Sequence, residues 1–557
     1  MNVFLRVGLF GALVAALVTV PGLWLGTLWD NSETAYSEVA REILLSHDAI
    51  VMHLNSAAWY IQPPLYFWLA AGAAKIWGSE SSFAYRLPSA IATIVMSGAL
   101  AMFVRGYTRS QTARYAACIL ATMLLQAVLG RFASMDALLD VFVMLTTLSG
   151  FIAVWPTTTP GKRAASAIFA AMCAALGVLT KGLVALLIPL LILIPWGLWE
   201  RRFHSLVRPA PLPLLVAAGA FLCISLPWYL LLGIATGSHG LSELILHYTF
   251  GRYLGTIENQ TGPFWYYVPV VLLGALPWTS FLLPALWQAR PGAPVSANGN
   301  SSTLTRFGFV WTIVPFLFFS FAKTKLPNYV ALCAPGMALL CAVWLEQALE
   351  QRRRRHVLIA AATIPLSLLA LALGLIIYAH HLNMSGALKS LSHTAIDAVL
   401  AIGLGTGAGV LALRRRRYAR WAPYCFGAGT IAAMLIIAFA GLAQAEQFKP
   451  IPPLAKIIMQ VRQANDVIAL QSVGGENALM FYTQPPIAVL ASPDTLAPLP
   501  QNKPALVLCA APRVLLVAPL QRPSHDPTYG RRRRLLASSL KDALYLIDGP
   551  PCNSPPA

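Results

Sequence analysis

Apolar runs and short polar gaps alternate along most of the chain. Each run is roughly 20 residues long, the length that a helix needs to cross the hydrocarbon core of a bilayer. The pattern predicts about 13 spans, expected at 7–29, 87–104, 115–130, 137–155, 164–180, 182–199, 211–235, 263–287, 307–322, 329–348, 357–379, 395–413 and 422–443. After residue 443, short helix-like and β-rich runs alternate with Pro and Asp. We therefore expect an all-α polytopic membrane domain over 1–443 and a small α/β domain over 444–557.

Composition supports a membrane protein. Hydrophobic residues make up 57% of the 557 residues and charged residues 11%, whereas soluble proteins carry about 25% charged residues. This balance excludes a soluble enzyme, a disordered chain and a fibrous repeat. The net charge of +19 predicts no nucleic-acid partner, because most Lys and Arg between the spans fall in alternate gaps, as the positive-inside rule requires. The rule places the N-terminus in the cytoplasm, and the 30–86 loop, the 236–262 loop and the C-terminal domain on the outer side.

The 30–86 loop has a helical pattern of its own. Ala35, Val39 and Ile43 recur at helical spacing, and charged residues occupy the opposite face. Such a helix is expected to lie in the membrane interface. The sequence QPP at 62–64 interrupts the chain before a second apolar helix at 65–77. The loop is therefore predicted to be an ordered element with interfacial helices.

Acidic residues on the outer side are candidates for catalysis. Asp30 and Glu33 follow the first span, and Asp136 lies in a tight outward turn, RFASMDALLD. Two acids that face each other across the outer rim suit general-base or metal-holding work. The simpler interpretation is that Asp30 and Glu33 cap a helix and that Asp136 pairs with its neighbour Arg131. The residues alone leave both interpretations open.

Cationic residues on the outer side are candidates for holding a phosphate. Lys181 lies in LTKGLVALL, Lys323 and Lys325 in AKTKLPNYV, and Arg252 in an aromatic-rich loop that continues to PFWYY. Snorkelling of long cationic side chains is the alternative. Acids, cations and aromatic residues at one interface favour a lipid-linked phosphate substrate. The sequence has no P-loop or Rossmann fingerprint, so the transferred group must come from an activated donor.

These motifs resemble a known family when they are taken as a set and in order. They are similar to the GT-C membrane glycosyltransferases of the protein-mannosyltransferase-like group, and within it to the lipid A 4-amino-4-deoxy-L-arabinose transferases. The matching segments are SETAYSEVAREIL at 32–44, PPLYFWL at 63–69, RLPSA at 86–90, the turn at 131–136, LTKG at 179–182, PFWYY at 263–267, LPW at 276–278 and KTKLPNYV at 323–330.

The resemblance implies a function. Such enzymes pass a sugar from a polyprenyl-phosphate carrier, here undecaprenyl phosphate, to an acceptor on the outer face of the bacterial inner membrane. In the aminoarabinose enzymes the acceptor is lipid A, and the modified lipopolysaccharide resists polymyxin. A single displacement predicts inversion at the sugar. The implied site comprises Glu33, Asp136 and Asp30 as catalytic acids, Arg252, Lys181, Lys323 and Lys325 as ligands of the carrier phosphate, and Gln62 and Tyr329 in the substrate pocket.

The sequence departs from the family pattern at three places. Ser32 stands where the family has Asp, Ile61-Gln62 where it has Glu-Lys, and Gln260-Thr261-Gly262 where it has a His. The departures leave open the sugar, the acceptor and the need for a divalent metal; no other cofactor is implied. The alternatives are a protein O-mannosyltransferase, another envelope-glycan transferase and, outside the enzymes, a transporter of lipid-linked sugars.

Overall fold

A computed structural model of the chain describes residues 2–201, 211–255, 260–292, 299–350, 355–363, 368, 373, 386–471, 474–484, 486–491, 513–519, 532–539 and 542–548. The chain forms two compact units. The first comprises Met1–Leu23, Ile61–Tyr66 and Arg86–Gly441, and the second comprises Trp24–Tyr60, Phe67–Tyr85 and Leu442–Ala557.

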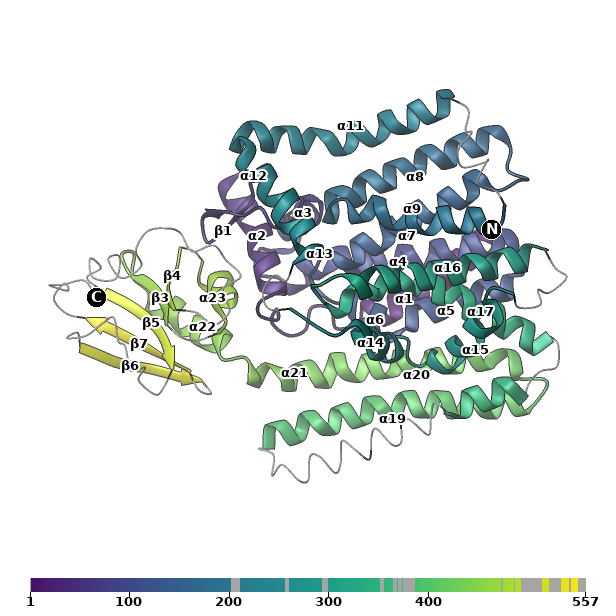
Figure 1. Ribbon diagram of the computed structural model, residues 1–557. Helices are drawn as coiled ribbons and strands as arrows, with labels where there is room; N and C mark the ends of the chain where they lie inside the picture. Colours follow the sequence, from purple (N-terminus) through teal and green to yellow (C-terminus); the bar gives the residue numbers. More distant parts are fainter. Residues whose placement is uncertain are drawn as a thin grey trace. The chain divides into compact units, whose positions relative to one another are not determined.

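The first unit consists of helices that pack side by side (Figure 1). They are α1 (Val3–Thr19), α4 (Ser82–Tyr107), α5 (Ser110–Thr122), α6 (Leu124–Leu129), α7 (Asp136–Val154), α8 (Pro160–Lys181), α9 (Val184–Trp199), α11 (Pro211–Thr236), α12 (Ser238–Ser242), η1 (Glu243–Gly251), α13 (Arg252–Leu254), η2 (Phe264–Tyr266), α14 (Tyr267–Gly274), α15 (Thr279–Ala289), α16 (Gly299–Phe321), η3 (Pro327–Cys333), α17 (Ala334–Glu350), α19 (Gly386–Arg414), η4 (Ala419–Trp421), α20 (Ala422–Ile436) and η5 (Ile437–Gly441).

Among the described residues, eight helices are long and apolar enough to cross a membrane, or nine if the bent pair Phe264–Gly274 and Thr279–Ala289 is one span. The sequence predicted about 13 spans. Part of the difference arises because some predicted spans contain shorter helices, such as Val3–Thr19 and Val184–Trp199. The predicted span 357–379 lies mostly outside the described residues. The chain is a multi-pass membrane protein.

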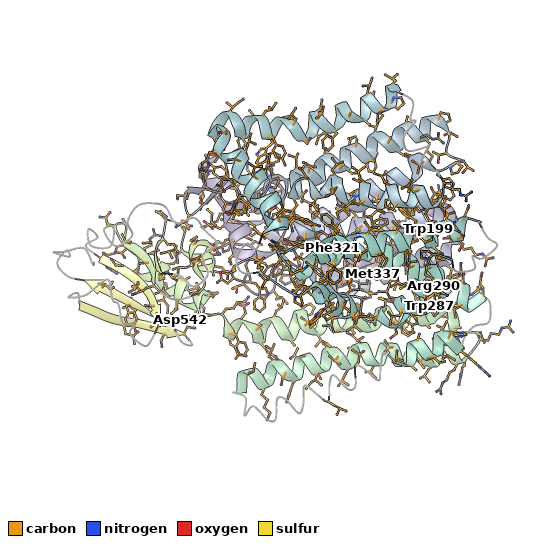
Figure 2. All side chains as sticks on the ribbon, in the orientation of Figure 1. Trp199, Trp287, Arg290, Phe321, Met337 and Asp542 are labelled. Atoms are coloured by element: carbon orange, nitrogen blue, oxygen red, sulfur yellow. The ribbon has the colours of Figure 1, made fainter. Side chains whose placement is uncertain are left out.

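Small residues allow the helices of the first unit to approach closely. A Cβ atom on Gly405 of α19 would lie 2.6 Å from the Cα atom of Gly429 in α20. This is the contact that small residues provide in membrane helices. On the surface of the first unit, large apolar side chains such as Trp287 and Phe321 are 69% and 67% exposed (Figure 2). Such exposure suits side chains that face lipid.

The second unit contains a five-stranded mixed sheet. Its strands are β3 (Val467–Gln471), β4 (Ala488–Ala491), β5 (Arg513–Pro519), β6 (Arg532–Ser539) and β7 (Asp542–Asp548), in the order β4-β3-β5-β7-β6. β3 pairs in parallel with β4 and β5, and β7 pairs antiparallel with β5 and β6. Helices α22 (Ile451–Val461) and α23 (Glu476–Thr483) complete this region. The predicted fold class, a helical membrane domain with a small α/β domain, is confirmed.

Segments of the first loop belong to this second unit. They include α2 (Glu33–Ser46), the short hairpin β1 (His53–Leu54) and β2 (Ala57–Ala58), and most of α3 (Leu65–Trp77). α2 was expected to expose its charged face, but both of its faces are buried. The guanidinium of Arg41 donates two hydrogen bonds to Glu38, at 2.9 and 2.8 Å, and one to the carbonyl of Met480 in α23 at 3.2 Å. Packing between α2 and α23 therefore satisfies charges that the sequence pattern assigned to a polar surface.

Candidate functional site

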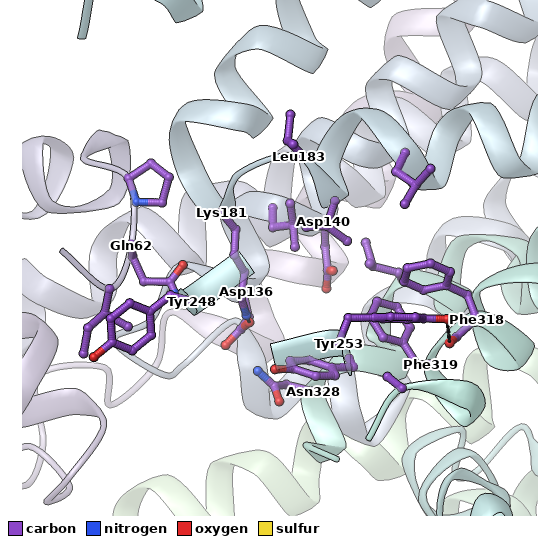
Figure 3. A pocket seen from close by; sticks show the side chains of 18 of the residues that line it. Gln62, Asp136, Asp140, Lys181, Leu183, Tyr248, Tyr253, Phe318, Phe319 and Asn328 are labelled. Carbon is purple, nitrogen blue, oxygen red and sulfur yellow. Dashed lines mark hydrogen bonds and ion pairs between the residues drawn. The ribbon is translucent and has the colours of Figure 1, made fainter. Parts of the chain in front are cut away.

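A cavity of about 310 Å³ lies within the first unit. Most of its wall is aliphatic or aromatic, which suits an apolar ligand with a few fixed polar contacts. Figure 3 shows side chains from several helices that converge on it. Its polar lining residues are Gln62, Asp136, Asp140, Lys181, Asn328 and the tyrosines 248, 253 and 329, and its apolar ones include Leu139, Leu183, Val184, Leu187, Leu244, Phe318 and Leu332.

Asp136 and Lys181 form an ion pair in the wall of the cavity. Asp136 begins α7 and Lys181 ends α8, so each charge complements the dipole of its own helix. Gly182 follows Lys181 with a φ of +79° and a ψ of −159°, a backbone conformation that is open mainly to glycine. Both charged side chains are 13% exposed. The second oxygen of Asp136 accepts a hydrogen bond from the hydroxyl of Ser134 at 3.1 Å.

The turn before α7 is fixed by contacts with neighbouring helices. The hydroxyl of Ser89 in α4 donates to the carbonyl of Ser134 at 2.9 Å. A Cβ atom on Gly130 would lie 2.6 Å from the hydroxyl oxygen of Thr93, so glycine permits the close approach. These contacts set the position of Asp136 at the start of its helix.

Arg131 does not provide the ion pair of Asp136 that the sequence suggested as an alternative. Its guanidinium donates to the carbonyls of Val18 and Thr19 at the end of α1, at 3.0 and 3.1 Å. Burial, together with the nearby charge of Arg86, lowers the pKa of Arg131 to about 10. The ion-pair partner of Asp136 is therefore Lys181, whereas the sequence interpretation suggested Arg131.

Lys323 and Lys325 differ in their surroundings, although they are two residues apart. Lys325 is 5% exposed, and its ammonium donates to the carbonyls of Phe319 and Ser320 at the end of α16, at 3.1 and 2.6 Å. Burial lowers the pKa of Lys325. Lys323 is exposed, and its backbone N–H donates to the carbonyl of Tyr253 at 3.1 Å. The lining of the cavity includes neither lysine.

Two other predicted site residues line the cavity, and a third is the neighbour in sequence of a lining residue. Gln62 and Tyr329 both line it, and the ammonium of Lys181 lies 5.3 Å from the ring centroid of Tyr329. Arg252 begins α13, whose next residue, Tyr253, also lines the cavity. The side chain of Arg252 lies outside the part of the chain that the structure describes.

Asp30 and Glu33 lie in the second unit. Glu33 is fully buried, and its carboxylate accepts a hydrogen bond from the backbone N–H of Trp29 at 2.9 Å. Asp30 accepts one from the hydroxyl of Thr34 at 3.1 Å and one from the backbone N–H of Ala478, near the start of α23, at 3.0 Å. Glu33 thus satisfies an N–H group just before α2, whereas the N–H group that Asp30 satisfies belongs to α23.

The sequence interpretation missed four polar residues of the cavity, namely Asp140, Asn328, Tyr248 and Tyr253. Asp140 follows Asp136 by four residues on α7, and this spacing puts both on one face of the helix. Asn328 lies within the KTKLPNYV motif, and its side chain hydrogen-bonds to Asp136. The helical spacing of two acids in an apolar span was the available signal for Asp140.

No cluster of metal-binding side chains is found among the described residues. They contain no group of three or more His, Cys, Asp or Glu side chains that could hold a metal ion. The apolar Ile61 lines the cavity. An isoleucine side chain offers no ligand atom to a cation.

Comparisons with known proteins agree with this architecture. The dolichyl-phosphate-mannose-protein mannosyltransferase family matches residues 61–229. An undecaprenyl phosphate-alpha-4-amino-4-deoxy-L-arabinose arabinosyl transferase of Erwinia tasmaniensis is 31% identical over 61% of this chain and 59% of its own length. The transferase of the same name from Edwardsiella ictaluri is 29% identical over 82% of this chain and 80% of its own length. The structure also matches the crystal structure of ArnT from Cupriavidus metallidurans bound to undecaprenyl phosphate. The match covers 97% of each chain, with 20% sequence identity and a TM-score of 0.79.

The structural match shows that the chain has the fold of the solved ArnT. Its sequence is similar to those of the aminoarabinose transferases and, over residues 61–229, to the mannosyltransferase family, which agrees with the resemblance found in the motifs. The match to the Erwinia protein spans about three fifths of that relative's length.

Proposed function

We propose that the protein is an inverting glycosyltransferase that moves a sugar from a polyprenyl-phosphate carrier to an acceptor on the periplasmic face of the bacterial inner membrane. The sugar is 4-amino-4-deoxy-L-arabinose and the acceptor is lipid A, in keeping with the names of its relatives. The observation that carries the proposal is the largely apolar cavity of about 310 Å³ with the Asp136–Lys181 pair in its wall. Apolar walls suit an isoprenoid chain, and the ion pair suits the charged end of a lipid-linked sugar.

The reaction is a displacement at the anomeric carbon of the sugar. An oxygen of the acceptor phosphate bonds to this carbon while the bond from the carbon to the carrier phosphate breaks, and the electron pair leaves with the carrier phosphate. Attack on the face opposite the leaving group inverts the configuration. The phosphate acceptor is already ionised, so no base has to remove a proton from it. A hydroxyl acceptor would instead lose its proton to Asp136 or Glu33.

The charged and polar residues of the proposed site divide the remaining work. Lys181 stabilises the negative charge that grows on the leaving phosphate, and Asp136 holds the Lys181 ammonium in position. Arg252 and Lys323 are further ligands of the carrier phosphate. Gln62 and Tyr329 border the sugar.

Mass spectrometry of lipid A tests the proposal. A host that lacks its own aminoarabinose transferase would express either this chain or its Asp136→Asn variant, with equal amounts of each in the membrane. We expect an added aminopentose with the parent chain and at most a trace with the variant. Unmodified lipid A in cells with folded parent protein would contradict the proposal.

A protein O-mannosyltransferase is the second candidate. The match to the dolichyl-phosphate-mannose-protein mannosyltransferase family favours it, because the matched residues 61–229 include Asp136 and Lys181. Mannose on periplasmic proteins of the same cells, together with unmodified lipid A, would select this candidate.

A further inference from the structure

Asp140 is a buried acid on the cavity that the proposed mechanism does not use. It is 3% exposed, lies one helical turn beyond Asp136 on α7, and lines the same cavity. In Figure 3 its carboxylate points toward the interior of the cavity. An acid within an apolar span is costly, so its presence there calls for a function.

A neutral side chain holds Asp140 in place. The amide of Gln126, which is fully buried, donates to one oxygen of Asp140 at 3.2 Å and to the carbonyl of Ala331 in η3 at 3.1 Å. The second contact anchors the amide to another element of the unit. The carboxylate is therefore oriented by a group that brings no positive charge.

The charges around the cavity are unequal. Lys181 pairs with Asp136, whereas no cation of the described chain forms an ion pair with Asp140. Both acids and the single lysine belong to the lining that the structure describes. The cavity is therefore suited to a ligand that brings one positive charge to the Asp140 end.

We propose that Asp140 binds the protonated amino group of the transferred sugar and so selects aminosugar donors over neutral ones. This inference rests on the proposed function. Asp136 and Asp140 are separated by four residues, which is about 6 Å along the helix axis. A sugar with its anomeric carbon near Lys181 can thus place a ring substituent at Asp140.

The walls of the cavity include aromatic side chains. Tyr253 and Phe318 both line the cavity, and their ring centroids lie 4.8 Å apart. Aromatic faces pack against the C–H groups of a sugar, while the carboxylate of Asp140 accepts a charge-assisted hydrogen bond from the amine. A neutral sugar would leave the buried carboxylate without its partner, and this penalty creates the selectivity.

Two donors that differ only at the amine test the inference. The first is undecaprenyl phosphate carrying 4-amino-4-deoxy-L-arabinose, and the second is the same molecule with the amine acylated and therefore neutral. The purified full-length protein would transfer each donor to lipid A. We expect kcat/KM to favour the free amine by about 100-fold in the parent protein and by less than about 10-fold in Asp140→Asn, because only the reaction of the free-amine donor slows.

Two further variants keep the test decisive. Thr147→Ser, two turns further along α7 and outside the lining of the cavity, should leave the preference at its parent value. If Asp140→Asn does not fold, Gln126→Leu replaces it. Losing the amide that orients Asp140 should lower the donor preference, a ratio that a general loss of stability would not change.

The possible outcomes separate the two proposals. Equal rates with both donors in the parent protein, or an undiminished preference in the Asp140 and Gln126 variants, would overturn the role of Asp140 and leave the transferase intact. No transfer from either donor by folded parent protein would overturn the proposed function, and the inference with it.

Discussion

The two units bury acidic side chains with different partners. In the first unit, Asp136 and Asp140 line a cavity, and their side-chain partners include Lys181 and Gln126. In the second unit, the acids of α2 are matched within the fold: Glu38 pairs with Arg41, and Glu33 accepts a backbone N–H. A buried acid is therefore not by itself a functional residue. What distinguishes the two regions is whether the carboxylate borders space that a ligand can enter.

The largest expected effect of a substitution is at the Asp136–Lys181 pair. Asp136→Asn and Lys181→Met should each lower kcat by roughly 10²- to 10⁴-fold, because each removes charge from the reacting end of the cavity. The double variant should lose little more than either single variant, since residues that act as a unit are not additive. Transfer assays on the purified protein measure all three. Losses that multiply would show that the two side chains act independently.

Glu33 tests whether an acid of the second unit takes part in the reaction. Glu33→Gln keeps an oxygen that can accept the N–H of Trp29, so the melting temperature should hold. If the charge contributes to catalysis, kcat should fall by about 10- to 100-fold. Unchanged transfer would assign Glu33 to capping alone.

Glu38→Gln is the matched control for Glu33→Gln on the same helix. It breaks the buried pair with Arg41 and leaves an uncompensated guanidinium, which should lower stability by about 3 kcal/mol. Its kcat in the folded fraction should match that of the parent protein. A fall in kcat as large as that of Glu33→Gln would mean that the assay reports the integrity of α2 rather than the charge of Glu33.

Much of the first unit could be predicted from the sequence, because apolar runs of span length have few alternatives to a membrane helix. The motifs also pointed to Asp136, Lys181, Gln62 and Tyr329, all of which line the cavity. Partners were harder to predict, because Arg131 and Lys181 are equally cationic and only the packing of α8 beside α7 selects Lys181.

The second unit shows the limit of reading one helix at a time. The periodicity of α2 is that of an amphipathic helix, and an amphipathic helix usually exposes its charges. Its charged face is buried because α23, more than 400 residues later in the chain, supplies the carbonyl of Met480 to Arg41. No local pattern contains that contact.

Lys323 and Lys325 belong to one motif, and substitutions at the two positions should have different effects on stability and on carrier binding. Lys325→Met leaves the carbonyls at the end of α16 without their donor, so stability should fall by about 1–3 kcal/mol. Lys323→Met removes an exposed charge and should leave stability unchanged, while KM for the carrier rises a few-fold. Thermal melting and initial rates on both variants give the answer. The reverse result would mean that Lys325 binds the carrier and that Lys323 stabilises the fold.

The smallest expected effect concerns the pH dependence of the second unit. Burial raises the pKa of Glu42 from 4.5 to about 7, and the nearby charge of Glu38 adds to the shift. Between these two pH values the native state binds more protons than the unfolded chain, so stability is highest at the acidic end and falls as the pH rises toward 7. Glu42→Gln removes this titration but keeps an acceptor for the backbone N–H of Ser56, which lies 3.2 and 3.1 Å from the two carboxylate oxygens.

The comparison is therefore between two melting temperatures for each protein, one near pH 5 and one near pH 8. The parent protein should lose on the order of 1 kcal/mol more than Glu42→Gln across this interval, after allowance for solvent screening. Equal slopes in the parent protein and Glu42→Gln would mean that Glu42 stays ionised throughout this pH interval.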